Sequence, residues 1–232
     1  MLHTTAPLMV FDLDGTLIDS LPDLTVAANH MLESYNLPPL SDTQIRAMIG
    51  DGVKVLIRKI LSTAKSVSEE ELPTPLIEEA TRRYMAYYTP HSTDLTHLFP
   101  HTHSTLQNLA EKGWAMAVCT NKPVKAAETI LQHLGINSFF STVSGGDSFP
   151  HMKPHPEHLL GTIQKISGDI RKTIMVGDHY NDLFAARDAK IAGSIFAQWG
   201  YGRKEMEKEA TLVAQTITDL PTYGQKILEQ RD

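Results

Sequence analysis

Cysteine is almost absent from this sequence, since Cys119 is the only one among 232 residues. A single cysteine excludes a disulfide within the chain and is typical of a reducing compartment. Long hydrophobic runs are also missing, because no apolar stretch approaches the roughly 18 residues that a membrane span needs. The segment from Met1 to Pro7 lacks the basic residues and the apolar run of a signal peptide. These absences lead us to expect a cytoplasmic protein with no membrane partner.

The sequence lacks an excess of basic charge as well. It has 21 Lys and Arg against 27 Asp and Glu, a net charge of −6 at pH 7. A mildly acidic chain is poorly suited to nucleic acids, so we expect none as a partner. The content of 41 % hydrophobic and 21 % charged residues is ordinary for a globular protein and excludes a disordered or fibrous chain. At about 150 residues per domain, the length fits one large domain or one domain with a sizeable insertion.

Short apolar runs that stop at polar residues recur along the chain and predict a parallel sheet. Such runs are typical of strands that are covered on both faces. We expect strands at residues 8–11, 115–119, 173–176, 194–197 and 211–214. Helical patterns lie between them, and two of these end at Gly113 and Gly135, where glycine commonly follows a helix. The alternation of strands and helices predicts an α/β fold.

A stretch of about 70 residues after the first strand has helical periodicity and no convincing strand. Within it, Ser41 and Gln44 have the spacing of a capping box. We interpret residues 20–94 as a helical domain inserted into an α/β domain that is formed by residues 1–19 and 95–232.

Two acidic residues follow the first predicted strand directly, in Asp12-Leu13-Asp14-Gly15-Thr16. In open α/β sheets, ligands bind beyond the carboxyl ends of the strands. Carboxylates at this place could serve as nucleophile and acid/base, or begin a Mg²⁺ site, because this cation prefers oxygen ligands. The simpler alternative is an Asp-Gly turn at a strand end.

A second acidic motif, Gly177-Asp178-His179-Tyr180-Asn181-Asp182, ends the strand predicted at 173–176. On its own it is more typical of helix capping, since Asp favours helix N-termini. Joined to Asp12 and Asp14, it brings four carboxylates to one edge of the sheet. Without a cation these groups would repel one another and raise one another's pKa values. The combination therefore favours a divalent metal ion.

Two further segments could hold an anion at the same edge. Thr120 and Asn121 follow the strand predicted at 115–119 and offer a hydroxyl, an amide and backbone N–H groups to phosphate oxygens. Lys153 precedes Pro154, and a lysine held in this way is a compact cation suited to phosphate charge. Each of these segments alone is more often an ordinary loop or a solvated lysine.

Taken in order, these motifs resemble the four motifs of the haloacid dehalogenase superfamily of phosphatases. The resemblance covers nearly the whole chain, and the insertion matches the helical cap that this superfamily carries on a Rossmann-like core. The segments 49–52, 145–150 and 152–156 are similar to phosphoglycolate phosphatase-type members. His179 departs from the serine that is usual after the motif aspartate. The resemblance implies Mg²⁺-dependent hydrolysis of a small phosphorylated metabolite, by a monomer or a homodimer.

The resemblance also implies a role for each matching residue. Asp12 would attack phosphorus and form an aspartyl-phosphate, and Asp14 would act as acid and base. Thr120 and Lys153 would complete the catalytic set by holding phosphoryl oxygens. The implied substrate-binding residues are Thr16, Asn121, Arg46 and Gly52, and the implied Mg²⁺ ligands are Asp12, Asp14 (through its backbone carbonyl), Asp178 and Asp182. Arg46 and Gly52 lie in the insertion, where a solvated helix-face cation is an equally good interpretation of Arg46.

Other functions remain compatible with parts of the pattern. A phosphosugar phosphatase or mutase, or a pyrophosphatase of the same superfamily, would share every motif. A dehalogenase typically lacks the second aspartate, which argues against it. A non-catalytic binding protein on this scaffold should have lost a motif residue, and none is missing.

The histidines invite a zinc interpretation that the sequence does not favour. Zinc sites usually need four well-placed ligands, and no cysteine partner is available. Prolines among the histidines also make a regular helical face improbable. We therefore expect no zinc site at His97, His101 and His103, and none at His151, His155 and His158.

Overall fold

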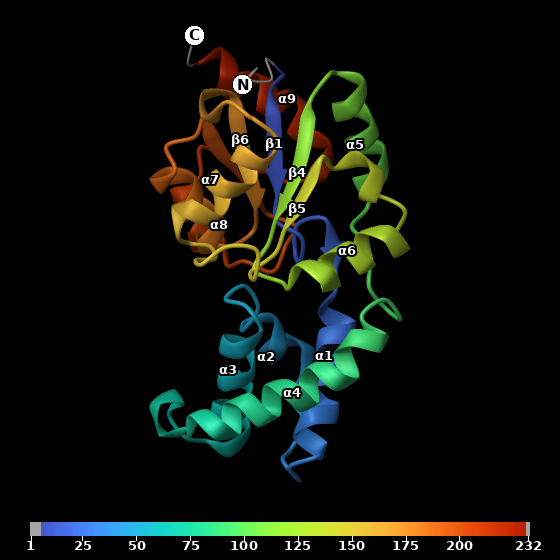
Figure 1. Ribbon diagram of the computed structural model, residues 1–232, viewed down its shortest axis with the longest axis vertical. Helices are drawn as coiled ribbons and strands as arrows, with labels where there is room; N and C mark the ends of the chain where they lie inside the picture. Colours follow the sequence, from blue (N-terminus) through green and yellow to red (C-terminus); the bar gives the residue numbers. More distant parts are fainter. Residues whose placement is uncertain (1–5, 231–232) are drawn as a thin grey trace. The chain divides into compact units, whose positions relative to one another are not determined.

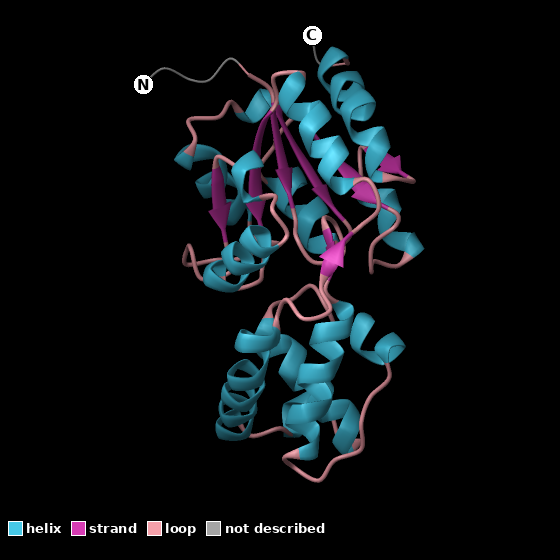
Figure 2. Cartoon of the chain, turned by 90° about the vertical axis from the view of Figure 1, so that its right-hand side faces the viewer, coloured by secondary structure: helices cyan, strands magenta, loops and turns pink. Residues whose placement is uncertain are grey.

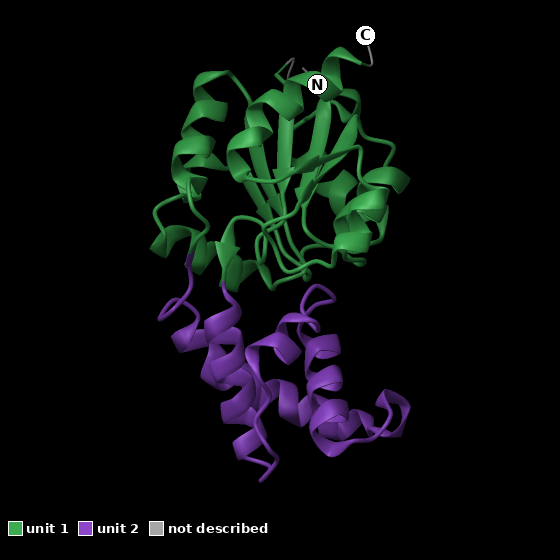
Figure 3. Ribbon diagram, turned by 180° about the vertical axis from the view of Figure 1, so that it is seen from behind, with its two compact units in different colours: residues 1–19, 98–232 green, residues 20–97 purple. Residues whose placement is uncertain are grey.

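The computed structural model describes residues 6–230, which divide into two compact units (Figure 3). Unit 1 combines the chain up to Asp19 with the chain from Leu98 onward, and unit 2 is Ser20–His97. The sequence pattern placed the end of the insertion slightly earlier, at residue 94. In the part of the chain that is described, no helix has both the length and the apolar character needed to cross a membrane.

Unit 1 contains a six-stranded parallel sheet with the strand order β5-β4-β1-β6-β7-β8 (Figures 1 and 2). The strands are β1 (Leu8–Phe11), β4 (Ala115–Cys119), β5 (Thr142–Ser144), β6 (Thr173–Gly177), β7 (Gly193–Ala197) and β8 (Leu212–Ala214). The predicted α/β fold is confirmed, and the five expected strands all form. The sixth, β5, was not expected. The first strand lies at the centre, because β1 pairs with both β4 and β6.

Alternate residues of the central strands enter cores on opposite faces of the sheet, as the period of two in a strand requires. Met9 and Phe11 belong to one core and Leu8 and Val10 to the other, and all four are buried. The first core includes residues of α5 (Thr102–Glu111), α6 (Val124–His133) and α9 (Leu220–Glu229), and the second includes residues of α7 (Pro156–Lys165) and α8 (Tyr180–Asp188). Helices thus cover both faces, and the carboxyl ends of the strands share one edge.

Short elements complete the chain. Strands β2 (Ile18–Asp19) and β3 (His97–Leu98) form a separate two-stranded sheet at the two points where the chain leaves and re-enters unit 1. The short 3₁₀ helices span Glu69–Glu71, Asn137–Phe139, Ile170–Lys172, Lys204–Glu209 and Ile217–Asp219.

Unit 2 is a helical bundle with its own apolar core. Its helices are α1 (Leu21–Glu33), α2 (Asp42–Arg46), α3 (Val53–Lys65) and α4 (Thr74–His91). Buried residues of α1, α3 and α4, such as Met31, Ile57 and Tyr84, form that core. The expected capping box is present, since the Ser41 hydroxyl accepts from the Gln44 backbone N–H and the Gln44 side chain accepts from that of Ser41.

A buried carboxylate ties the two ends of unit 2 together. Asp23, in the first turn of α1, is 4 % exposed. Its oxygens accept hydrogen bonds from the backbone N–H of Leu95 at 3.0 Å, the backbone N–H of Thr96 at 2.8 Å and the Thr96 hydroxyl at 2.7 Å. Because the carboxylate satisfies these donors, its burial is compensated.

Candidate active site

Asp12 lies at the carboxyl end of β1, directly after the buried run Leu8–Phe11. Its backbone N–H donates to the carbonyl of Val176 in β6 at 2.9 Å, which continues the sheet by one more residue. The Asp12 side chain retains 12 % of its accessible surface. The central strand therefore presents this carboxylate at the edge where α/β sheets bind their ligands.

Lys153 supplies a buried cation to this carboxylate. Its ammonium group lies 3.0 Å from an oxygen of Asp12 and 2.6 Å from an oxygen of Asp182, and the side chain is 2 % exposed. Burial alone would lower the pKa of this lysine, but the two carboxylates outweigh burial and raise the pKa above its usual value. Lys153 therefore stays charged.

Backbone contacts hold Lys153 in place on a segment without regular structure. The Asn121 side-chain amide donates to the Lys153 carbonyl at 2.8 Å, and the Lys153 backbone N–H donates to Nδ1 of His158 at 3.2 Å. Asn121 follows β4 and His158 lies in α7, so the segment is held from two elements of the core. A lysine fixed in this way keeps its charge at one position, which favours electrostatic stabilisation.

Asp178 follows β6 and has both carboxylate oxygens fixed by hydrogen bonds. One oxygen accepts from the Thr16 hydroxyl at 3.2 Å, and the other accepts from the backbone N–H groups of Tyr201 at 2.7 Å and Gly202 at 3.1 Å. Burial, together with the charges of Asp12 and Asp182, raises the pKa of Asp178 to about 8, although the hydrogen bonds from Tyr201 and Thr16 oppose this rise. The group is oriented, yet the surrounding charge opposes its ionisation.

Two glycines leave the space that the side chains of Asp178 and Asp182 occupy. Gly15 has a φ of +82°, and a Cβ placed on it would lie 2.8 Å from the carboxyl carbon of Asp178. A Cβ on Gly177 would overlap the carboxyl group of Asp182. At both positions glycine is required by the close approach, and at Gly15 also by the left-handed backbone.

The charge at this edge is not balanced by the protein alone. Oxygens of Asp12, Asp178 and Asp182 lie within 4.8 Å of one another, and all three residues are buried. Burial and the nearby Asp12 raise the pKa of Asp182, although Lys153 opposes them. An all-oxygen set in which Asp178 and Asp182 have raised pKa values fits a hard divalent cation such as Mg²⁺, which would supply the missing positive charge.

Asp14 has a different environment from the three buried carboxylates. The ammonium group of Lys122 lies 3.0 Å from each of its carboxylate oxygens, and the Asp14 side chain is 14 % exposed. Lys122 donates its backbone N–H to the Thr120 hydroxyl at 3.3 Å, so Thr120 shapes the turn that carries this lysine. The pattern did not predict the Lys122 contact, because it depends on side-chain direction after β4.

The other expected residues differ in their placement. Thr16 is fully buried and its hydroxyl donates to Asp178, so it positions this carboxylate, while the expected contact with substrate stays a prediction. Asn121 lies at the site through its contact with Lys153. Arg46 is the last residue of α2 and is exposed, and Gly52 precedes α3 with a φ of +81°, both in unit 2.

His179, the departure from the family pattern, has a local structural role. Its Nδ1 accepts from the Asn181 backbone N–H at 3.3 Å, while its own backbone N–H donates to Asp182 at 3.0 Å. This is the reciprocal arrangement of a capping box at the start of α8. A histidine thus caps the helix that carries Asp182.

Known proteins are similar to this chain in sequence and in fold. Residues 9–195 match the haloacid dehalogenase-like hydrolase family. A phosphoglycolate phosphatase of Agrobacterium fabrum is 37 % identical over 227 residues, covering 97 % of this chain and 95 % of the relative. One from Vibrio cholerae is 40 % identical over 198 residues, covering 85 % and 87 %. A solved structure of a predicted phosphoglycolate phosphatase from Haemophilus somnus 129pt has a TM-score of 0.87 at 32 % identity, covering 95 % and 98 %.

The family match spans β1 through most of β7, and therefore includes every acidic residue at this edge of the sheet together with Lys153. With relatives above 30 % identity along nearly their whole length, the chain is a member of the haloacid dehalogenase-like hydrolase family.

Proposed function

We propose that the protein is a Mg²⁺-dependent phosphatase that hydrolyses a small phosphomonoester, with 2-phosphoglycolate as the first substrate to test. The family and the relatives indicate a phosphoric monoester hydrolase, and the relatives' names support a small phosphorylated substrate. The observation that carries the proposal is the position of Asp12, at the end of the central strand and beside the fixed charge of Lys153. The substrate itself is inferred from the relatives' names.

The chain's own residues account for two chemical steps. A carboxylate oxygen of Asp12 attacks phosphorus, the bond from phosphorus to the ester oxygen breaks, and Asp14 gives the departing alkoxide a proton. Water then attacks the aspartyl-phosphate, Asp14 takes a proton from that water, and phosphate and Asp12 are released. Lys122 orients the Asp14 carboxyl group through its two contacts.

Positive charge is needed because a phosphoryl group brings further negative charge to an acidic site. Lys153 is held at a fixed position beside Asp12 and stabilises charge on the phosphoryl oxygens. Mg²⁺, held by Asp12 and Asp178 with Asp182 nearby, would supply the remaining positive charge when bound. The proposed ligation by the Asp14 carbonyl and the proposed contact of Thr120 with phosphate belong to the same hypothesis.

Within the superfamily, unit 2 is proposed to set the choice of substrate. Arg46 and Gly52 of unit 2 are proposed to meet the part of the substrate that is distant from phosphorus. A phosphosugar phosphatase, a mutase or a pyrophosphatase would use the same core residues, and their products differ. Hydrolysis releases inorganic phosphate, whereas a mutase returns an isomeric phosphate ester.

A phosphate-release assay tests the proposal directly. We expect activity with Mg²⁺ on 2-phosphoglycolate that exceeds the activity on sugar phosphates, nucleotides and pyrophosphate, and that disappears in EDTA. Asp12→Asn should remove turnover while circular dichroism shows an intact fold, and Asp188→Asn, at an exposed carboxylate of α8, should leave turnover unchanged. Turnover that persists in Asp12→Asn would refute the assigned nucleophile, and turnover that ignores EDTA would refute the metal.

A further inference from the structure

A second group of metal-binding side chains lies on the surface of unit 1, apart from the buried carboxylates. His151, His155 and Glu157 each offer one ligand atom, and these atoms lie within 4.8 Å of one another. Nε2 of His151 is 3.8 Å from Oε2 of Glu157, and Nδ1 of His155 is 3.9 Å from the same oxygen. The two imidazole rings stack with their centroids 4.3 Å apart. None of the three residues has a role in the proposed reaction.

The backbone that carries these three side chains is ordered without a metal ion. Pro150, Pro154 and Pro156 limit the backbone around the two histidines, and the His155 backbone N–H donates to the Met152 carbonyl at 3.0 Å. Glu157 stands in the first turn of α7, two residues after the N-cap residue His155. Because this part of the backbone is already ordered, binding of a metal ion would lose little free energy to ordering it.

The donor atoms are in a suitable chemical state. Nδ1 of His155 accepts a hydrogen bond from the Glu157 backbone N–H at 3.3 Å, so its lone pair already points toward the first turn of α7. A metal ion would exchange this long hydrogen bond for a coordinate bond. In a tetrahedral zinc site the ligand atoms are about 3.4 Å apart, whereas the two histidines lie 3.8 and 3.9 Å from Glu157. The imidazole rings stack at an interplanar angle of 29°, so they would have to turn out of the stack to direct both lone pairs at one ion, which exposed side chains can do.

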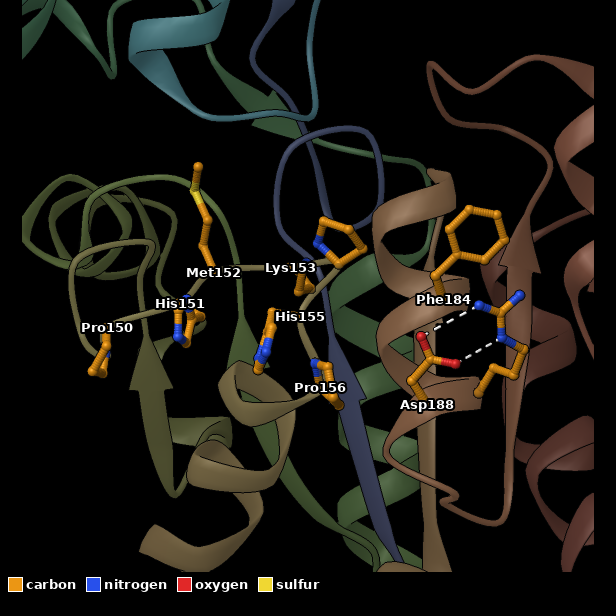
Figure 4. A pocket seen from close by; sticks show the side chains of 10 residues that line it. Pro150, His151, Met152, Lys153, His155, Pro156, Phe184 and Asp188 are labelled. Atoms are coloured by element: carbon orange, nitrogen blue, oxygen red, sulfur yellow. Dashed lines mark hydrogen bonds and ion pairs between the residues drawn. The ribbon is translucent and has the colours of Figure 1, made fainter.

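Solvent can reach the group, as a metal site with a water ligand requires. The side chains of His151, His155 and Glu157 keep 55 %, 45 % and 60 % of their accessible surface. The two histidines also line a pocket beside α8, where Figure 4 shows them side by side on the segment that carries Lys153. Two imidazoles and one carboxylate with a position left for water form a typical donor set for zinc.

We propose that His151, His155 and Glu157 form a surface site for one divalent transition-metal ion of the zinc type, separate from the buried acidic cluster. Imidazole nitrogen favours such ions over Mg²⁺ and Ca²⁺, so the two sites select different metals. The proposal differs from the expectation of no zinc site, because it uses Glu157 in place of His158. His158 is fully buried and its Nδ1 accepts from Lys153.

The site spans both sides of Lys153, since His151 and His155 each lie two residues away from it. A bound ion would tie residues 151–155 to the first turn of α7. We therefore expect amide hydrogen exchange in this segment to slow when the ion binds, which is a readout independent of phosphatase activity.

Calorimetric titration with Zn²⁺ in the presence of excess Mg²⁺ tests the site. The wild-type protein should bind one Zn²⁺ here, and Asp178→Asn should bind it equally, because that change affects only the buried cluster. His151→Ala and Glu157→Gln should each weaken binding by at least about tenfold, the loss expected even for outer-sphere partners. His133→Ala, at an exposed histidine of α6, is the matched control and should bind as the wild type does.

Two outcomes would overturn the proposal. The first is Zn²⁺ binding that survives in a His151→Ala, His155→Ala double variant with unchanged affinity. The second is binding that is lost in Asp178→Asn and retained in His151→Ala, since the ion would then occupy the carboxylate cluster. His151→Ala and Glu157→Gln should keep the wild-type melting temperature in EDTA, because their side chains are exposed, and this separates lost binding from lost folding. The double variant also loses the N-cap hydrogen bond of His155, so it should melt at a lower temperature but still fold.

Discussion

Replacing Lys153 by methionine tests whether its charge balances the buried carboxylates. Methionine keeps the unbranched aliphatic stem but removes the ammonium group, which is bonded to Asp12 at 3.0 Å and to Asp182 at 2.6 Å. Breaking a buried ion pair from one side costs about 3–5 kcal/mol, because the remaining charge stays buried without a partner. In a protein of this size each kcal/mol lowers the melting temperature by about 2–4 °C, so we expect a loss of about 6–20 °C in EDTA.

Magnesium provides the second half of this prediction. If the carboxylates lack only positive charge, saturating Mg²⁺ should restore part of the stability lost in Lys153→Met, and the deficit in melting temperature should be smaller than in EDTA. Thermal unfolding followed by circular dichroism, with and without Mg²⁺, measures both deficits.

Lys122→Met is the matched control for the charge argument. Lys122 is also nearly buried, at 5 % exposure, but its partner Asp14 is 14 % exposed and reaches solvent more easily than Asp182 at 1 %. We expect Lys122→Met to lower the melting temperature by less than Lys153→Met does, because Lys122 has a partner that reaches solvent and Lys153 has a partner at 1 % exposure. The reasoning fails if Lys153→Met melts within 2 °C of the wild type in EDTA, or if Mg²⁺ leaves its deficit unchanged.

Three further changes test other contacts of the buried carboxylates. Gly15→Ala puts a methyl group 2.8 Å from the carboxyl carbon of Asp178, so calorimetry should show Mg²⁺ affinity reduced at least about tenfold, and unchanged affinity would contradict the assignment. Asp23→Ala leaves donors of Leu95 and Thr96 without their acceptor, and urea unfolding should show a loss of about 3 kcal/mol. The pKa of Asp178 is raised to about 8 from 3.8, so the folded state keeps a proton that the unfolded state loses. Stability in EDTA should therefore fall as pH rises between these values, Mg²⁺ affinity should rise, and Asp178→Asn should flatten both trends.

Most strands were predictable because each is a short apolar run that ends at a polar residue. Strand β5, Thr142–Ser144, was missed since three residues of mixed character form a strand only by pairing with β4 at the sheet edge. Helix α9 was also missed. It contains Gly224, a poor helix former, and a Cβ there would lie 2.8 Å from the Trp114 ring, so packing against the sheet has overridden propensity.

The meeting of the acidic motifs was predictable for a topological reason: β1 and β6 are parallel neighbours, so Asp12 and Asp178 follow adjacent strand ends. The finer contacts were not predictable. Thr16 supports Asp178, and Asn121 supports Lys153, through hydrogen bonds between residues far apart in the sequence. Such pairs depend on register and side-chain direction, which a single sequence does not reveal.

The central place of β1 has a consequence for synthesis of the chain. Phe11 pairs with Val118 on one side and with Val176 on the other, so the strand before Asp12 leaves the ribosome long before either neighbour exists. At about 5–20 residues per second, roughly ten seconds or more pass before β6 follows. Synthesis of unit 2 is complete within that interval. Because unit 2 has its own core, it can fold before β6 has been synthesised. A nascent chain that ends before β6 therefore contains Asp12, the residue proposed as nucleophile, but contains neither Asp178 nor Asp182.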